Sequence, residues 1–495
     1  MLRIEHVQDI DTLRQMALLL ERENQRLIDR VKELTLEMSR LKGQDASKAQ
    51  QELTLLQELL DRRNQALFGD SSEKRRSRST KDDSENRAPR RGHGPKAQPE
   101  LPIVERVHEL DEADRTCDAC GGVMDEMGDQ VEESEEVTVV ERQFVLVKQR
   151  RKKYRCKCNG CVKTAPAPPK VKPGSRYSPE FAVEVATSKY LDHLPLERQC
   201  RIMCREGLQI NSQTLWDQIE ALAALLRPTY KALRARVLAS PLVHADETHW
   251  RLMKKGSNKR WWVWATASPD AVVYRILNSR STEAAAVVLP GYKGIVMADG
   301  YGVYEKLSRD GPSFTLVHCW AHARRKFVEI EEHYPEECAS ILEFIGKLYE
   351  IERMARGDSE EAAGLRAKLR DEQSRPLIQE IYDWALEQRP LPRSGLGQAI
   401  DYMLGIWPGL KAFLDDPRIP LDNNHAERGL RGVVVGRKNH YGSRSKRGTE
   451  VAALFYSLFE SAKLAGVEPK TYLLKATHAA IADRKAATLP HELLN

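Results

Sequence analysis

Residues 242–247 read Leu-Val-His-Ala-Asp-Glu, and residues 295–300 read Ile-Val-Met-Ala-Asp-Gly. Each stretch is a short, mainly apolar run of strand length that ends at an aspartate, Asp246 or Asp299. Similar runs lie at 261–267, 272–277 and 315–319, with helical patterns between them at 281–289 and 321–332. This alternation of strands and helices predicts an α/β layer structure.

The two strand-end aspartates predict a site for cations, because an acid at the tip of a buried strand costs free energy unless a cation or hydrogen bonds compensate it. A third acid, Glu427, lies in Asn-Asn-His-Ala-Glu-Arg (423–428), where Asn423 or Asn424 could cap a helix. Three converging carboxylates repel one another, and two Mg²⁺ ions would remove that repulsion and clamp a phosphodiester displacement. The alternative for any single acid is a solvated cap.

The neighbouring acid Glu247 is expected to point to the opposite face of its strand from Asp246. It is therefore a weaker candidate for the cation site than Asp246, Asp299 and Glu427. Beyond the strands, residues 335–415 carry no strand-length run and predict an all-helical insertion. A strand-like stretch at 432–435 and a helix at 450–465 are expected to close the domain.

A cluster of cysteines predicts a structural zinc site. Cys117 and Cys120 form a CxxC pair, and Cys158 and Cys161 form a second pair with Cys156 close by as a possible substitute. Thiolates from two turns can hold one tetrahedral Zn²⁺ and leave no open position for a substrate. Reduced cysteines without a metal are the alternative. The scattered Cys200, Cys204, Cys319 and Cys338 are expected to be buried apolar residues.

Residues 195–219 predict a helix-turn-helix. A helix starting at Pro195 is broken by Gly207, and Asn211 or Ser212 can cap a second helix. The second helix of such a motif enters the DNA major groove, where Gln213 and Gln218 could contact base edges or phosphates. Helix–glycine–helix corners also occur in proteins that bind no DNA.

The N-terminus predicts a two-stranded coiled coil. Leucine recurs every seventh residue, with Ile, Ala, Asn, Val and Met three residues before each leucine; the leucines are Leu13, Leu20, Leu27, Leu34 and Leu41. A single polar residue in that second row, Asn24, is typical of a fixed register and a homodimer. A lone amphipathic helix is the alternative. A second helical stretch follows at 50–67.

The 495 residues are 41% hydrophobic and 30% charged, which predicts several domains with sizeable cores. No run of about 18 apolar residues or apolar leader segment is present, so we expect a cytoplasmic, nucleoid-associated protein. The net charge is only +6, but three segments concentrate positive charge: nine Lys/Arg against three acids at 74–96, seven bases at 148–157 and seven at 428–448, the last two without acids. Three such segments predict a nucleic-acid partner.

An ordered set of motifs resembles the IS66-type transposases of bacterial insertion sequences over nearly the whole chain. The matching segments are Leu-Phe-Gly (67–69), Ser-Glu-Lys (72–74), the cysteine module, 154–168, His-Ala-Asp-Glu-Thr (244–248), Met-Ala-Asp-Gly-Tyr (297–301), Cys-Trp-Ala-His-Ala-Arg-Arg-Lys-Phe (319–327) and Asn-Asn-His-Ala-Glu-Arg-Gly-Leu-Arg (423–431).

The resemblance implies a ribonuclease-H-like catalytic domain with a DDE triad, Asp246, Asp299 and Glu427, that works with two Mg²⁺ or Mn²⁺ ions. It also implies an N-terminal half that binds terminal inverted repeats, strand transfer to target DNA, and accessory proteins of the same element. Arg324, Arg325, Arg431, Arg437 and Lys438 are expected to contact DNA. The rival interpretation is a dimeric DNA-binding protein with a degenerate nuclease-like domain.

Together these observations predict a multidomain chain with consecutive parts. They are a coiled coil at 1–68, a basic linker at 69–100, a zinc-ribbon-like module at 101–164, a Pro-rich linker at 165–176, a helix-turn-helix region at 177–240, a catalytic domain at 241–465 with a helical insertion at about 333–417, and a C-terminal tail at 466–495.

Overall fold

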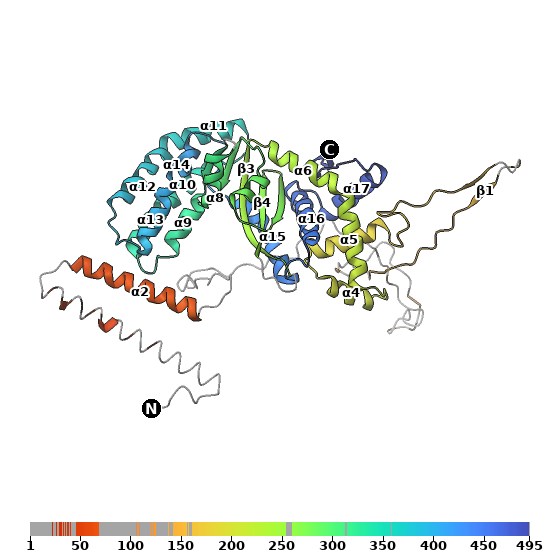
Figure 1. Cartoon of the computed structure of the whole chain (residues 1–495), viewed down its shortest axis with the longest axis horizontal. Helices are drawn as coiled ribbons and strands as arrows, with labels where there is room; N and C mark the ends of the chain where they lie inside the picture. Colours follow the sequence, from red (N-terminus) through yellow and green to blue (C-terminus); the bar gives the residue numbers. More distant parts are fainter. Residues whose placement is uncertain are drawn as a thin grey trace, which may run out of the picture. The chain divides into compact units, whose positions relative to one another are not determined.

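The structure is a computed structural model of the whole chain (Figure 1). It describes residues 46–68, 142–155, 161–253, 260–311, 314–357 and 359–494, together with scattered positions between 22 and 157. Residues 1–67 and 144–495 form one compact unit, and residues 68–143 form a second. In the part of the chain that is described, no helix is both long and apolar enough to span a bilayer.

The heptad leucines and Asn24 of the predicted coiled coil lie outside the described residues. Two of the residues that lie three positions before a heptad leucine, Val31 and Met38, are described; both are helical and exposed. The second helical stretch is α2 (Ala46–Phe68).

A five-stranded mixed sheet lies at the centre of the larger unit and confirms the predicted α/β layer. Its strands are β3 (Leu242–Arg251), β4 (Arg260–Ser268), β5 (Ala271–Leu277), β6 (Ile295–Ala298) and β7 (Thr315–His318). The spatial order is β5-β4-β3-β6-β7; β4 is antiparallel to β3 and β5, whereas β3, β6 and β7 are parallel. Helices α7 (Thr282–Val288) and α8 (Gly302–Asp310) connect β5 to β6 and β6 to β7.

The edge strand β5 is closed off by α16 (Lys446–Leu464). The hydroxyl of Ser461 accepts a hydrogen bond from the Val272 N–H (2.9 Å) and donates one to the Val272 carbonyl (2.9 Å). The Ser457 hydroxyl accepts from the Tyr274 N–H (2.8 Å). Because these backbone groups are already bonded, β5 cannot add a further strand at this edge.

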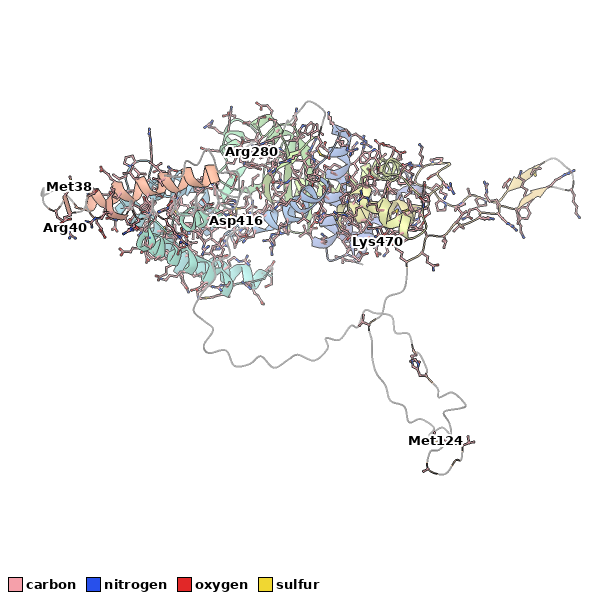
Figure 2. All side chains as sticks on the ribbon, turned by 90° about the horizontal axis from the view of Figure 1, so that it is seen from below. Met38, Arg40, Met124, Arg280, Asp416 and Lys470 are labelled. Atoms are coloured by element: carbon pink, nitrogen blue, oxygen red, sulfur yellow. The ribbon has the colours of Figure 1, made fainter. Side chains whose placement is uncertain are left out.

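Four helices precede the sheet and pack in one apolar core with β3–β5 and with α17 (Pro469–Ala482), the last long helix. These four are α3 (Pro179–Tyr190), α4 (Leu196–Arg205), α5 (Ser212–Leu225) and α6 (Arg227–Ala239). Lys470 of α17, which is labelled in Figure 2, pairs with Glu184 of α3 at 2.6 Å. The expected tail at 466–495 therefore contains a helix that packs into the core, because Tyr472, Leu473, Ala476, Thr477 and Ala480 of α17 are buried.

The predicted helical insertion is present between β7 and the last part of the domain. After α9 (Trp320–Val328), which follows β7, it consists of α10 (Pro335–Met354), α11 (Glu360–Leu369), a π-helical turn (Arg370–Ser374), α12 (Arg375–Glu387), α13 (Gly395–Gly405), α14 (Trp407–Lys411) and a 3₁₀ turn (Ala412–Leu414). These helices share a second apolar core with β6, β7 and α9.

A buried arginine fixes the end of the insertion. Arg370 is 1% exposed and donates two hydrogen bonds to Glu352, at 2.7 and 2.8 Å. It also donates to the carbonyls of Asp416 (3.0 Å; labelled in Figure 2) and Ile419 (2.9 Å). A planar guanidinium can hold several acceptors at fixed angles, so the return segment 413–419 is held against the insertion helices.

The stretch expected to be a strand at 432–435 lies instead in α15 (Asn424–His440). Only Val433 of its three valines is buried, and the buried positions of α15 recur at helical spacing: Ala426, Leu430, Val433, Arg437 and His440. The longer helical period overrides the local β-propensity of the valines.

We predict that His440 makes the protein less stable in acid. Its ring nitrogens lie 3.0 Å from the Tyr456 hydroxyl and 3.3 Å from the Gly442 carbonyl, and burial, with the charge of Lys189, lowers its pKa to about 3. The unfolded chain therefore binds a proton that the folded chain does not, between about pH 6.5 and pH 3. The free energy of unfolding should therefore decrease as the pH is lowered through this window, by at most about 1.4 kcal/mol per pH unit from this residue.

The measurement is urea unfolding at several pH values. His440→Gln should show a shallower fall in stability than wild type, although the buried His244, whose pKa is lowered to about 4, still contributes in both proteins. The exposed His478, which pairs with Glu180 at 3.4 Å, provides the control His478→Gln. An unchanged slope in His440→Gln would contradict the prediction.

Candidate active site

The two aspartates lie at corresponding positions of neighbouring strands, but only Asp299 is at a strand end. The expectation that Asp246 ends its strand is wrong, because β3 continues to Arg251 and pairs with β4 beyond Asp246. The parallel register of β3 and β6 pairs His244 with Met297, and two residues further along each strand stand Asp246 and Asp299. Neighbouring strands are about 4.8 Å apart, so this register brings Asp246 in the middle of β3 close to Asp299 just after β6. The proximity of the two aspartates therefore follows from the parallel pairing of β3 with β6.

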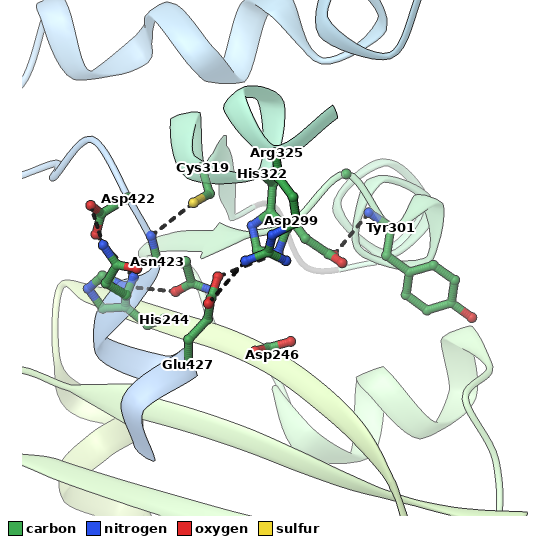
Figure 3. A network of polar contacts seen from close by, with 12 residues as sticks. His244, Asp246, Asp299, Tyr301, Cys319, His322, Arg325, Asp422, Asn423 and Glu427 are labelled. Atoms are coloured by element: carbon green, nitrogen blue, oxygen red, sulfur yellow. Dashed lines mark hydrogen bonds and ion pairs between the residues drawn. The ribbon is translucent and has the colours of Figure 1, made fainter. Parts of the chain in front are cut away.

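Glu427 reaches the same region from the first turn of α15 (Figure 3). One of its oxygens, Oε2, accepts a hydrogen bond from Arg325 Nη2 at 3.3 Å, and the other, Oε1, lies 3.6 Å from His322 Nε2. His322 and Arg325 both belong to α9, the helix that follows β7. The charge of Glu427 is therefore compensated from α9.

The mutual repulsion of these acids is visible at Asp246. Burial, and then the charges of Glu247, Asp299 and Glu427, raise the pKa of Asp246 to about 8. The carboxylate accepts a hydrogen bond from the Glu247 N–H at 2.7 Å, which acts in the opposite direction but is outweighed. Such a strongly raised pKa at a cluster of acids is typical of a functional site.

Glu247 has the separate role that its position on the other strand face predicts. It forms an ion pair with Arg280, whose Nε donates at 2.8 Å, and accepts a hydrogen bond from the Tyr304 hydroxyl at 2.7 Å. The guanidinium of Arg280, labelled in Figure 2, lies 3.7 Å from the centroid of the Tyr301 ring and 4.8 Å from that of Trp262. Arg280 lies in a loop without any motif, so nothing in the sequence indicated it.

The arginines and glutamines expected to contact DNA have different surroundings. Arg324, Arg431, Lys438 and Gln213 are exposed, and Gln218 is half-buried. Arg437 is 5% exposed and donates to the Thr248 hydroxyl (3.1 Å) and to the His249 carbonyl. The expectation of a DNA contact at Arg437 is corrected, because α15 turns this residue toward β3.

The two helices predicted for DNA reading are present as α4 and α5. Gly207 has a left-handed backbone (φ 85°) between them, and the Asn211 side chain accepts a hydrogen bond from the Thr214 N–H at 2.8 Å as the cap of α5. Gln213 stands in the exposed first turn of α5, where its amide donates to Asp217 at 2.8 Å. The two helices and the glycine between them therefore lie where the sequence predicted them, and a DNA-reading helix-turn-helix stays a prediction.

The cysteine cluster is described only in part. Cys117, Cys120, Cys156 and Cys158 lie outside the described residues. Cys161 is an exposed free thiol directly before β2 (Val162–Thr164), which pairs with β1 (Lys153–Arg155) in an antiparallel hairpin. Of the scattered cysteines, Cys319 and Cys338 are buried as expected, Cys200 is half-buried and Cys204 is exposed.

The acids suit magnesium in donor type. Within the described ranges, no three His, Cys, Asp or Glu side chains are grouped closely enough to hold an ion as they stand. The carboxylates of Asp246, Asp299 and Glu427 supply only oxygen donors, which Mg²⁺ and Mn²⁺ prefer. Glu427 Oε1 is buried and has no hydrogen-bond partner, so a cation could satisfy this atom.

Comparisons with known proteins identify two matching family models. The one described as "Transposase IS66 family" matches residues 174–451, and the one described as "zinc-finger binding domain of transposase IS66" matches residues 114–159. The second match contains Cys117, Cys120, Cys156 and Cys158 and ends before Cys161.

Two similar proteins come from Sinorhizobium fredii and are both named as uncharacterized. The protein y4jD is 31% identical over 402 residues, which are 77% of this chain and 77% of y4jD. The protein y4hP is 31% identical over 420 residues, which are 79% of this chain and 75% of y4hP.

We predict that a divalent cation stabilises the folded chain through Asp246. Because the folded pKa of Asp246 is raised to about 8, the metal-free folded state holds a proton that the unfolded chain has lost, and stability falls as pH rises from about 4 to 8. Asp246→Asn removes this repulsion. The metal-free variant should therefore melt above wild type near pH 9 and close to it near pH 4.

Thermal melting with and without Mg²⁺ checks this. Saturating Mg²⁺ should raise the melting temperature of wild type near pH 8 and change that of Asp246→Asn much less. Asp310→Asn, at an exposed acid of α8, is the control and should respond like wild type. Equal Mg²⁺ shifts in wild type and Asp246→Asn would remove Asp246 from the site.

Proposed function

The chain belongs to the IS66 family of transposases, and we propose that it is an Mg²⁺-dependent DDE transposase that cleaves the ends of its insertion sequence and joins them to target DNA. The observation that carries the catalytic part is the pairing of Asp246 and Asp299 on adjacent parallel strands with Glu427 across from them. The sheet order β5-β4-β3-β6-β7, in which only β4 runs against its neighbours, supports a ribonuclease-H-like core.

In this proposal the three acids hold two divalent ions. Asp246 would contact both ions, and Asp299 and Glu427 would each hold one. Bound Mg²⁺ would activate the attacking oxygen and stabilise the leaving oxygen of a phosphodiester. Arg325 presents positive charge beside Glu427, and the exposed Arg324 of the same helix would add a contact to a DNA phosphate.

We further propose that DNA recognition belongs to the N-terminal half. The helices α4 and α5 would read the terminal inverted repeats, with Gln213 facing the major groove. The exposed Arg431 and Lys438 on α15 would contact the phosphate backbone. The N-terminal coil would join two copies, so that two ends are held by one homodimer or a higher assembly.

Strand cleavage of a donor plasmid that carries both element ends tests the catalytic proposal. Asp246→Asn, Asp299→Asn and Glu427→Gln should each slow cleavage by roughly a thousandfold or more, because each acid would hold an ion that supplies several kcal/mol of charge stabilisation. Double variants should be no slower than single ones, since the acids act as a unit.

The controls separate catalysis from binding. All three variants should still shift a DNA fragment that carries one element end, and Asp310→Asn should cleave like wild type. If wild type binds the ends but cleaves no faster than the variants, the chain is a DNA-binding protein with a degenerate nuclease-like domain.

A structural zinc ion is the second part of the proposal. Cys117, Cys120 and Cys158 would supply three thiolates, and the fourth would come from Cys161 or Cys156. The range of the zinc-finger match supports Cys156, because it ends before Cys161. Elemental analysis should find about one Zn²⁺ per chain. The metal should be lost in Cys117→Ser and in Cys156→Ser, and retained in Cys161→Ser and in the control Cys204→Ser.

Protein that contains no zinc would contradict the proposed structural zinc site. Loss of zinc in Cys161→Ser with retention in Cys156→Ser would assign the fourth ligand to Cys161.

A further inference from the structure

Asn423 occupies a fully buried position where three segments of the site meet. Its exposed fraction is 0%, and it lies at the start of α15, between β3 and α9 (Figure 3). Its side-chain Nδ2 donates a hydrogen bond to the Ala245 carbonyl at 2.9 Å. Its Oδ1 lies 2.9 Å from His244 Nδ1, and its backbone N–H donates to Cys319 Sγ at 3.1 Å.

The partners of Asn423 belong to the segments that carry the acid cluster or contact it. Ala245 directly precedes Asp246 in β3. Cys319 caps α9, which carries the two groups that contact Glu427. Asn423 itself accepts the Glu427 N–H on its carbonyl at 3.2 Å, in the first turn of α15. One residue therefore connects the backbone of the Asp246 strand with the backbone of the Glu427 helix.

The side chain of Asn423 is used for this connection and not for capping. Asparagine at the start of a helix ordinarily accepts a hydrogen bond from an N–H of the first turn. Asn423 makes no such bond, although it occupies the cap position. The neighbouring Asn424 is directed to Asp422 instead. Its backbone N–H donates to this carboxylate at 3.0 Å, and its side-chain amide donates to it at 2.6 Å.

The hydrogen-bond pattern also fixes the orientation of the amide. Because Nδ2 faces a carbonyl, the amide must present Oδ1 to His244, and His244 Nδ1 must carry the hydrogen and donate it. The His244 ring packs against the His425 ring at 5.4 Å, and His425 Nε2 lies 2.7 Å from the Ser268 carbonyl at the end of β4. The first turn of α15 is thus attached to both β3 and β4.

We infer that Asn423 is a positioning residue that sets the distance between the carboxylates of Glu427 and Asp246, with His244 holding its amide in place. This inference rests on the proposed metal-dependent function. Groups that orient metal ligands from behind typically contribute roughly 10- to 100-fold to metal affinity. A displacement of about 1 Å at a reacting centre can cost about 100-fold in rate.

The experiment measures Mn²⁺ binding to the full chain without DNA, by electron paramagnetic resonance titration of free Mn²⁺. Asn423→Ala should weaken Mn²⁺ binding by roughly 10- to 100-fold. Asn424→Ala removes the neighbouring amide and should bind like wild type. Glu427→Gln is the reference for loss of a direct ligand. Plasmid cleavage by Asn423→Ala should recover partly at high Mn²⁺, which a general loss of folding would not allow.

The outcomes separate this inference from the function on which it rests. If Glu427→Gln binds Mn²⁺ as tightly as wild type, the metal site itself is wrong. If Glu427→Gln is weakened but Asn423→Ala binds normally, only the role of Asn423 is overturned. Should Asn423→Ala fail to fold, His244→Phe keeps an aromatic ring at this position and removes the hydrogen bond to Oδ1. Normal Mn²⁺ affinity in that variant would overturn the inference as well.

Discussion

Electrostatic repulsion among buried carboxylates is the constraint on which the rest of this structure depends. Asp246 shares its surroundings with Glu247, Asp299 and Glu427, and acids withdrawn from water repel one another more strongly than in solution. The fold compensates the outlying charges separately, since Arg280 neutralises Glu247 on one strand face and Arg325 approaches Glu427 from α9. Among the described residues, no lysine, arginine or histidine forms an ion pair with Asp246, so a bound cation would compensate this carboxylate most.

The architecture places these charges through three different devices. Parallel strand pairing aligns Asp246 with Asp299, and this alignment requires no specific side chain. Glu427 comes from a helix whose start is attached to β3 and β4 by Asn423 and His425. The sheet itself is closed at β5 by the serines of α16, so the strands that carry the acids lie in a sheet with a protected edge.

The sequence predicted much of this arrangement, for reasons that differ between elements. Short apolar runs before an aspartate identified β3 and β6, because strand burial is a local signal, but they placed the end of β3 too early, since β3 continues to Arg251. The valines at 433–435 led to the wrong prediction of a strand. Their β-propensity is a local signal, whereas burial of Leu430 and Val433 on one helix face depends on packing against the sheet. Arg280 could not be predicted, since its importance arises only when folding brings it to Glu247.

The attachment of Arg370 to the return segment has a consequence for how this domain can diverge. That arginine holds the Ile419 carbonyl, the Trp320 N–H donates to the Leu421 carbonyl at 2.9 Å, and Asn423 follows two residues later. The segment between the insertion and α15 is therefore held at several successive residues. Distal helices of the insertion can gain or lose turns over evolutionary time, whereas a single inserted or deleted residue between 419 and 423 would shift the phase of α15 and rotate its acid away from the sheet.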